Sequence, residues 1–261
     1  MARKRFGQHF LHERGVIDRI LAAIDPAHDD RLVEIGPGQG ALTEPLLERV
    51  ERLSVIEIDR DLVEALSARA ATRPELDVIA GDALKIDYQA LAERRGGQLR
   101  LVGNLPYNIS SPLLFALLNC GAPIADMHFM LQKEVVDRIV AEPGGRDYGR
   151  LSVAIAARAD AQSLFDVGPG AFKPPPRVVS AVVRLRPRAP TFAIDDHAMF
   201  DRIVASAFGQ RRKTLRNALK PYLDASDIQA CDIDPTTRAE QLPAAAFAQL
   251  ANRATTRHTP S

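Results

Sequence analysis

The chain contains a glycine-rich turn, Gly36-Pro37-Gly38-Gln39-Gly40, between an apolar run and a helical pattern. The run Leu32–Ile35 has the length of a buried strand, and residues 41–50 have the composition of a helix. Such a turn lets the backbone approach a ligand closely and places helix N-terminal amides beside that ligand. A tight connecting turn explains the same glycines nearly as well, so the surrounding sequence has to decide.

Strand and helix patterns alternate after this turn as far as about residue 140. Strands are expected at 53–56, 76–80, 99–102 and 127–131, and later ones near 163–167 and 178–185. This order predicts an α/β fold with a mainly parallel, doubly wound sheet and an added antiparallel piece. Ligands in such folds bind at the carboxyl ends of the strands, which directs attention to the strand ends.

Acidic residues stand at the expected ends of the second and third strands. Glu57 lies 21 residues beyond Gly36 (57 − 36), where an acid can accept hydrogen bonds from both hydroxyls of a ribose. Asp59 is the alternative, although we expect it to cap the following helix. Asp82 can accept a hydrogen bond from an adenine amino group, and a helix cap or turn residue is an equally good interpretation.

The fourth strand ends in Gly103-Asn104-Leu105-Pro106-Tyr107-Asn108. The side-chain carbonyl of Asn104 can accept a hydrogen bond from an exocyclic amine, and Pro106 stiffens the turn. Tyr107 offers a flat face on which a base can stack. Together these residues suit one task, which is to hold an amino group on a flat ring while its nitrogen reacts. The alternative is a strand-ending turn with a buried tyrosine.

A proline-rich stretch, Phe172–Ser180, contains three consecutive prolines and therefore predicts a stiff extended loop. We interpret Phe172 as a second stacking face, which opposes Tyr107 across a flipped base. The alternative is a linker in which Phe172 is a buried anchor.

Basic residues gather in two places, although the formal net charge of the 261 residues is only +1. A nucleic-acid argument must therefore rest on local clusters. One cluster lies at 211–216, in a segment without acidic residues, and we expect it to contact phosphate. The other lies in the N-terminal segment, which we interpret as a flap that closes over a ligand and contacts phosphate. A solvated face and a frayed tail are the alternatives. The cations concerned are Arg211, Arg212, Lys213 and Arg216, and Arg3, Lys4 and Arg5.

The chain becomes helical and alanine-rich beyond about residue 187. We therefore expect a sheet-containing domain at 1–187 and a small all-α domain at 188–261. The two cysteines lie far apart in no metal-ligand spacing, so no metal and a reducing compartment are expected. The chain shows no signal-peptide core and no membrane-length apolar run, which favours a cytoplasmic protein without membrane contact. A monomer is expected.

These motifs, in this order, resemble those of the ribosomal RNA adenine dimethyltransferase family. The matching segments are 4–11, the Gly36-x-Gly38 turn, 103–110, Phe172-x-Pro174-x-Pro176-x-Val178-x-Ser180 and 208–216. The resemblance implies a Rossmann-like class I methyltransferase sheet followed by an RNA-binding helical domain. The most similar branch is the bacterial one that dimethylates two adjacent adenosines near the 3′ end of small-subunit rRNA. Its partners are the small ribosomal subunit and its rRNA.

The resemblance also implies S-adenosylmethionine as the methyl donor. On this basis Gly36 and Gly38 approach its methionine part, and Glu57 binds its ribose hydroxyls. Asp82 with Ala83 contacts its adenine. His9 and Leu11 of the flap close over the donor, with Asn104 beside its methyl group. The family often has Asn where this chain has His9, so a backbone contact would survive the change and a side-chain contact would not.

The chemistry of adenine explains the strand-end motif in such an enzyme. The N6 lone pair is delocalised into the ring, which makes N6 a poor nucleophile. The Asn104 side-chain oxygen and the Leu105 carbonyl can accept its two N–H bonds and localise the lone pair toward the methyl group. Catalysis is then mainly positioning and electrostatic stabilisation, without a strong general base.

Other readings of the sequence explain less of it. A nicotinamide dehydrogenase shares the glycine turn and Glu57 but needs neither the Asn-Leu-Pro-Tyr motif nor the basic cluster. Methyltransferases that act on cytosine N4, DNA adenine or glutamine usually have Pro directly after the first motif residue, where this chain has Leu105. A non-catalytic ribosome-assembly factor and a large-subunit rRNA methyltransferase remain as alternatives.

Overall fold

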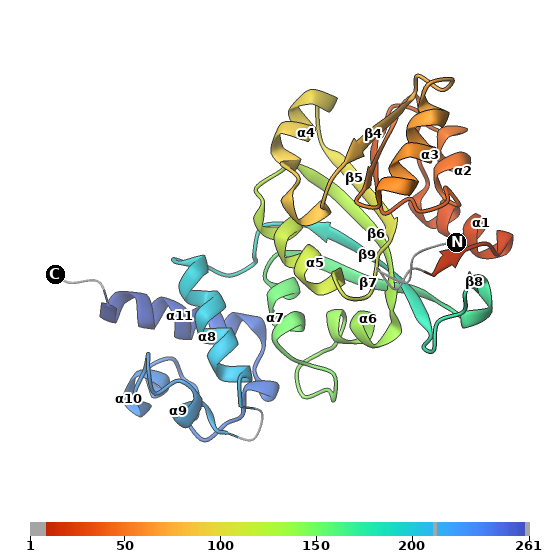
Figure 1. Ribbon diagram of the computed structural model, residues 1–261. Coiled ribbons are helices and arrows are strands. Elements are labelled where there is room, and N and C mark those ends of the chain that lie inside the picture. Colours follow the sequence, from red (N-terminus) through yellow and green to blue (C-terminus); the bar gives the residue numbers. More distant parts are fainter. Residues whose placement is uncertain (1–8, 211–212, 259–261) are drawn as a thin grey trace. The chain divides into compact units, whose positions relative to one another are not determined.

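The computed structural model describes residues 9–210 and 213–258 (Figure 1). The main sheet has seven strands in the order β4-β3-β2-β5-β6-β9-β7. Its strands are β2 Arg31–Ile35, β3 Leu53–Glu57, β4 Leu76–Ala80, β5 Leu99–Asn104, β6 Ile124–Gln132, β7 Ala159–Val167 and β9 Ser180–Pro187. The pairings among β4, β3, β2, β5 and β6 are parallel, and β9 runs antiparallel to β6. The predicted α/β fold class, including its antiparallel piece, is therefore confirmed.

The chain winds outward from β2 through β3 to β4 and then returns to β5 on the other side of β2. The strand order thus reverses between β2 and β5, and the crevice at such a reversal is where open α/β sheets bind ligands. The ends of β2 and β5 carry the glycine turn and Asn104, so the fold brings the two main motifs of the sequence to one place.

Helices cover both faces of this sheet. In Figure 1, α1, α2 and α3 lie on one face, and α4 and α5 lie on the other. Their bounds are α1 Arg14–Ile24, α2 Thr43–Leu47, α3 Arg60–Ala70, α4 Tyr88–Arg95 and α5 Ser110–Asn119. Leu21, Leu46 and Leu66 of the first three helices are buried in one apolar cluster with β2 and β3. Burial of such side chains is the main favourable contribution to folding.

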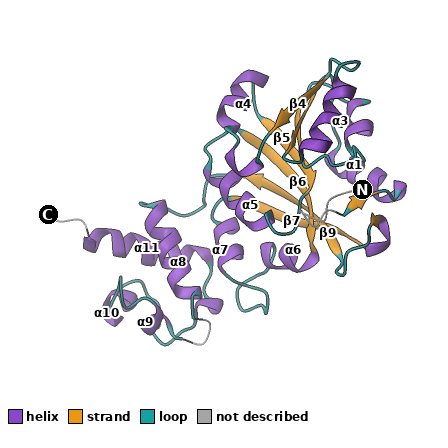
Figure 2. Cartoon of the chain, viewed as in Figure 1, coloured by secondary structure: helices purple, strands orange, loops and turns teal. Residues whose placement is uncertain are grey.

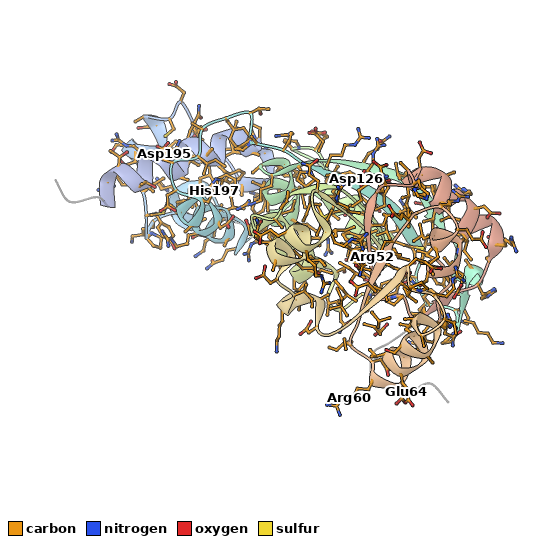
Figure 3. All side chains as sticks on the ribbon, turned by 90° about the horizontal axis from the view of Figure 1, so that it is seen from above. Arg52, Arg60, Glu64, Asp126, Asp195 and His197 are labelled. Atoms are coloured by element: carbon orange, nitrogen blue, oxygen red, sulfur yellow. The ribbon has the colours of Figure 1, made fainter. Side chains whose placement is uncertain are left out.

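Arg100 lies near the start of β5, at the end of the sheet away from the glycine turn and Asn104, and it holds the last turn of α1 there. Its Nη2 donates to the carbonyl of Ile24 at 2.6 Å and to Asp126 Oδ2 at 3.0 Å, and its Nη1 pairs with Asp30. Asp126, labelled in Figure 3, lies on the neighbouring strand β6. Because Arg100 binds a terminal carbonyl of α1, it caps that helix while satisfying two largely buried carboxylates.

A second, two-stranded sheet joins the start of the described chain to the proline-rich stretch. Strand β1, Phe10–Leu11, pairs antiparallel with β8, Phe172–Lys173. The short helix η3, Pro169–Ala171, precedes β8, and the backbone N–H of His12 donates to the carbonyl of Ala171 at 3.0 Å. Two-residue strands leave no periodic pattern, so the sequence did not predict this pairing.

The chain forms two compact units. The first contains residues up to 136 and 162–187, and the second contains 137–161 and 188–261. The expected domain boundary at 187/188 coincides with a boundary of these units, but residues 137–161 cluster with the second unit, whereas the sequence placed them in the first domain. Within this segment, the Tyr148 hydroxyl donates to the carbonyl of Leu242 at 2.7 Å, and Tyr148 is buried with Phe200 and Phe247.

Apart from the first residues of β7, the regular elements in the described part of the second unit are helices, as Figure 2 shows. Its helices are α7 Arg150–Ala156, α8 His197–Phe208, α9 Leu215–Ala218, α10 Ala225–Gln229 and α11 Ala244–His258, with the short helix η4 Ala239–Gln241. Helix α6, Lys133–Ile139, spans the boundary between the units.

Candidate active site

A pocket opens at the carboxyl ends of β2, β3, β4 and β5. It brings together eleven of the residues that the sequence assigned to donor binding or catalysis. They are His9, Leu11, Gly36, Gly38, Glu57, Asp82, Ala83, Asn104, Leu105, Pro106 and Tyr107. These residues come from segments almost 100 positions apart. The sheet reversal brings together those at the strand ends, and the pairing of β1 with β8 places His9 and Leu11 beside them.

The glycine turn forms the pocket wall after β2. Gly36 and Gly38 have φ values of +68° and +57°, a backbone region that side chains disfavour. A Cβ on Gly38 would lie 3.1 Å from the ring of Phe10, so the turn also gives room for the segment that contains β1. The wall is therefore bare backbone, which a ligand can approach closely.

Glu57 ends β3 with its side chain 4% exposed. Its Oε1 accepts hydrogen bonds from the backbone N–H groups of Ile58 at 2.9 Å and Asp59 at 3.0 Å, and its Oε2 accepts one from Gly38 at 3.3 Å. Burial raises the pKa of Glu57, while these backbone hydrogen bonds act in the opposite direction. Three bonds leave lone pairs on a carboxylate, so Glu57 can still accept from ligand hydroxyls. Asp59 caps α3, as expected.

Asp82 follows β4 and caps a short helix, which is one of the two interpretations that the sequence allowed. Its Oδ1 accepts the backbone N–H of Leu84 at 3.0 Å, which caps the short helix η2 at Ala83–Lys85. Its side chain also lines the pocket. The carbonyl of Ala83 accepts a hydrogen bond from Tyr88 Oη at 2.9 Å, which fixes this corner of the pocket.

Asn104 is oriented by the segment before β1. Its Nδ2 donates to the carbonyl of His9 at 3.0 Å. Oxygen and nitrogen of an Asn side chain are hard to distinguish by shape, but a backbone carbonyl can only accept, so the nitrogen has to face it. The carbonyl oxygen of the Asn104 amide is then the end left to accept a hydrogen bond from a ligand.

Tyr107 is fixed at its hydroxyl end. Its Oη lies 2.7 Å from Oγ of Ser180, which is fully buried at the start of β9. The ring centroid lies 5.8 Å from that of His9, at an interplanar angle of 31°. Leu105, which lies between Asn104 and Tyr107 in the sequence, has a buried side chain, and its backbone N–H donates to the carbonyl of Met130 at 3.2 Å. The structure therefore orients the Tyr107 ring and anchors the turn that carries it.

The stacking role that the sequence assigned to Phe172 is wrong for this structure. The Phe172 side chain is 2% exposed and packs with Leu11, Val167 and Ala171 in the apolar core. In β8 the side chains alternate, so Phe172 points inward and Lys173 is exposed. The alternative interpretation, a buried anchor, describes Phe172 correctly: it supports the β1 segment from behind.

Glu34 is a pocket residue that the sequence analysis missed. It is 2% exposed, and Thr43 Oγ1 donates to its Oε2 at 2.6 Å. Burial raises its pKa from 4.5 to about 7, with a smaller contribution from the charge of Glu57 and an opposing one from the Thr43 hydrogen bond. The available signal was a charged residue inside an otherwise apolar strand. A buried carboxyl in a pocket can pair with a cationic group of a ligand.

Replacing Glu34 with Gln should change how stability depends on pH. Between pH 4.5 and about 7 the unfolded chain carries an ionised Glu34 while the folded protein holds the proton, so wild-type stability falls as pH rises. The shift corresponds to about 3 kcal/mol. We expect the Gln variant to gain on wild type by up to this amount between pH 5 and pH 8, measured by denaturant unfolding without ligand.

The control for this experiment is Glu64→Gln, which removes an exposed carboxyl on α3 (Figure 3). Its stability should follow wild type at every pH. Parallel curves for Glu34→Gln and wild type would show that Glu34 titrates normally.

Two exposed apolar side chains at the pocket were also missed. Ile58 is 49% exposed after β3, and Leu84 is 38% exposed after β4, and both line the pocket. Apolar surface gathered at a cavity, unlike single exposed apolar residues, often marks a ligand-binding groove. Their place beside Glu57 and Asp82 suits the two faces of a flat ring. Each follows the acidic residue of its strand end by one or two positions, which is the signal that could have identified them.

The predicted RNA-binding residues are only partly described. Arg3, Lys4, Arg5, Arg211 and Arg212 lie outside the described residues. Lys213 and Arg216 are exposed in the second unit.

Comparison with known proteins identifies the family. The model of the ribosomal RNA adenine dimethylase family matches residues 1–256. A protein of Pseudomonas aeruginosa named ribosomal RNA small subunit methyltransferase A is 56% identical over 253 residues, which cover 97% of this chain and 94% of that protein. A protein of the same name from Xanthomonas oryzae is 56% identical over 252 residues, covering 96% and 95%.

Solved structures agree with this assignment. A dimethyladenosine transferase from Plasmodium falciparum superposes with a TM-score of 0.79 at 25% identity, over 93% of this chain and 96% of that one. The 23S rRNA methyltransferase ErmE has the same fold, with a TM-score of 0.68 at 23% identity over 94% and 99%. The family expected from the motifs is thus confirmed, and the chain belongs to the ribosomal RNA adenine dimethylase family.

Proposed function

We propose that this protein transfers methyl groups from S-adenosylmethionine to N6 of two adjacent adenosines near the 3′ end of small-subunit rRNA. The observation that carries the proposal is the orientation of Asn104. Its nitrogen is bound by the His9 carbonyl at 3.0 Å, which leaves its oxygen as an acceptor at the pocket. An amide acceptor at this place suits an exocyclic amine.

The pocket residues fit the donor. Glu57 can accept hydrogen bonds from ribose hydroxyls, and Ile58 and Leu84 suit the faces of its adenine. The backbone at Gly36 and Gly38 leaves room for its methionine part, and the Glu34 carboxyl can pair with an ammonium. When bound, the donor supplies a methyl group on a sulfonium, which needs no further activation. Position 9 of the flap contacts Asn104 through its backbone carbonyl, which supports the interpretation that this position acts through its backbone and tolerates His in place of Asn.

The strand-end motif holds the acceptor. The Asn104 oxygen and the Leu105 carbonyl accept the N–H bonds of adenine N6, which localises the N6 lone pair toward the methyl group. Tyr107 provides a flat face for the base, with its ring held by Ser180. The base stacks on Tyr107 in this proposal, and the buried Phe172 takes no part in the stacking. The methylated nitrogen is strongly acidic, so no protein base has to remove its proton.

The second unit supplies RNA contacts in this proposal. The segment with Lys213 and Arg216 packs along residues 235–238: the backbone N–H of Leu215 donates to the carbonyl of Thr237 at 2.9 Å, and Thr214 bridges to Arg238. Exposed Arg238 thereby joins the two predicted cations. A local concentration of positive charge without a paired acid favours phosphate binding.

Replacing Lys213 and Arg216 with Gln should weaken RNA binding by removing phosphate contacts. The salt dependence of the binding constant should flatten by about 0.9 per lost contact, the value for a nucleic-acid duplex of B-form charge density. The measurement is affinity for the small subunit at several salt concentrations. An unchanged slope would make the cluster a solvated face.

Location and assembly stay predictions. Across the described parts of the chain, no helix is long and apolar enough to cross a membrane. We propose a monomer that works in the cytoplasm on the small ribosomal subunit.

The decisive experiment is transfer of labelled methyl groups to small subunits that lack the adenine dimethyl marks, with large subunits and DNA as controls. Mass spectrometry then identifies the modified base. Dimethyladenosine on small subunits only is the expected result. Label on large-subunit RNA would assign the other branch of the family, and tight binding without transfer would indicate an assembly factor.

A further inference from the structure

The loop between β8 and β9 combines positive charge with exposed apolar surface. We call residues 173–179, Lys-Pro-Pro-Pro-Arg-Val-Val, the mouth loop. Lys173 and Arg177 are exposed, and Val178 and Val179 are 43% and 40% exposed. Among the described residues only four large apolar side chains are this exposed, and the other two line the pocket. The function proposed above does not yet use this surface.

Hydrogen bonds fix the mouth loop to the edge of the pocket. Nδ1 of His9 lies 2.8 Å from the carbonyl oxygen of Pro174 and acts as the donor, because that oxygen can only accept. At the other end, the carbonyl of Val179 accepts the backbone N–H of Lys133 at 2.9 Å. The next residue, Ser180, holds the hydroxyl of Tyr107 at 2.7 Å. Both His9 and Tyr107 line the pocket, so the loop continues its rim.

The two cations of the mouth loop are available for a ligand. In the described structure neither Lys173 nor Arg177 forms an ion pair or a side-chain hydrogen bond. The chain has no acidic residue between Gly168 and Ile194. Three consecutive prolines restrict the backbone that carries these cations, which lowers the entropy lost when the loop binds.

We propose that the mouth loop binds the ribose-phosphate backbone of the substrate strand beside the adenosine in the pocket. Lys173 and Arg177 contact phosphates, and Val178 and Val179 pack against a ribose or an unstacked base. This inference rests on the proposed function. A strand that delivers one base into the pocket has to pass over the rim on both sides, and phosphate contacts there fix the register of the strand.

The double variant Lys173→Gln/Arg177→Gln tests the proposal. We expect KM for small subunits to rise at least fivefold at physiological salt, with a smaller change in kcat, because the pocket itself is intact. On protein-free small-subunit rRNA, the salt slope of binding should fall by about 0.7 for each lost contact to a single strand. Donor affinity, measured by calorimetry, should equal that of wild type.

The matched control is Arg49→Gln/Arg52→Gln. It removes the same charge from two exposed residues just before β3, at the opposite end of the strands from the pocket; Arg52 is labelled in Figure 3. This variant should have the wild-type KM for small subunits and the wild-type salt slope of rRNA binding.

Each other outcome overturns a defined statement. If the mouth-loop variant keeps the wild-type KM and salt slope, the mouth loop does not bind RNA. The proposed methyl transfer would still stand in that case, provided that the wild-type protein methylates small subunits. A raised KM with an unchanged slope on protein-free rRNA would replace RNA with a ribosomal protein as the occupant. Wild-type protein that methylates no ribosomal subunit would refute the proposed function itself.

Discussion

Replacing Asn104 with Ala should reduce methyl transfer by about 10²- to 10³-fold, the usual cost of removing one positioned hydrogen-bonding group from a reacting centre. The variant loses the oxygen that accepts an N–H of adenine N6. It also loses the 3.0 Å hydrogen bond to the His9 carbonyl, which links β5 to the segment before β1. Initial rates on undermethylated small subunits measure the first loss.

Donor binding reports the second loss separately. Glu57, Asp82 and the glycine turn are unchanged in this variant, so calorimetry should show that part of the donor affinity persists. A transfer rate near that of wild type would refute the role of Asn104. Asn104 is only half-buried at the end of β5, so the variant should fold, which thermal unfolding can check.

Asn104→Asp separates the two contacts. It keeps an acceptor at the pocket but places a second carboxylate oxygen against the His9 carbonyl, so two acceptors face each other at about hydrogen-bond distance. We expect weaker donor binding than in Asn104→Ala, because the His9 segment is pushed away from the pocket. Stronger donor binding than in Asn104→Ala would show that the His9 contact is unimportant.

The sequence predicted the pocket well because its residues stand at strand ends. Gly36, Glu57, Asp82 and Asn104 each follow an apolar run of strand length, and parallel strands bring their carboxyl ends to one edge. Local pattern and known topology were therefore enough to place them together.

What the sequence could not predict depends on contacts between distant segments. Phe172 looked like a stacking ring until its pairing with the β1 segment, more than 160 residues away, placed it in the core. The same pairing fixes His9 beside Asn104. Glu34 was missed because its pKa is raised by burial, and burial depends on the packing of segments that the local pattern of β2 does not show.

Gly103→Ala should damage both halves of the pocket at once. A Cβ on Gly103 would lie 2.3 Å from the carbonyl oxygen of Ile35, far inside normal contact distance. Ile35 ends β2 directly before Gly36, and Gly103 directly precedes Asn104. The collision is with backbone, so it can be relieved only by moving β2 and β5 apart. Overpacking of this kind usually costs about 1–3 kcal/mol.

We expect Gly103→Ala to lower the free energy of unfolding by this amount, and to lose both donor affinity and at least tenfold in transfer rate. The matched control is Gly168→Ala, where an added Cβ meets no atom within 4 Å and φ is −70°. The control should keep the stability and rate of wild type, since it makes the same chemical change in open space. If Gly103→Ala also behaves like wild type in stability, affinity and rate, the close approach of β2 and β5 does not hold the glycine turn and Asn104 together. Donor affinity should fall further than in Asn104→Ala, because the collision with Ile35 displaces the glycine turn, which Asn104→Ala leaves unchanged.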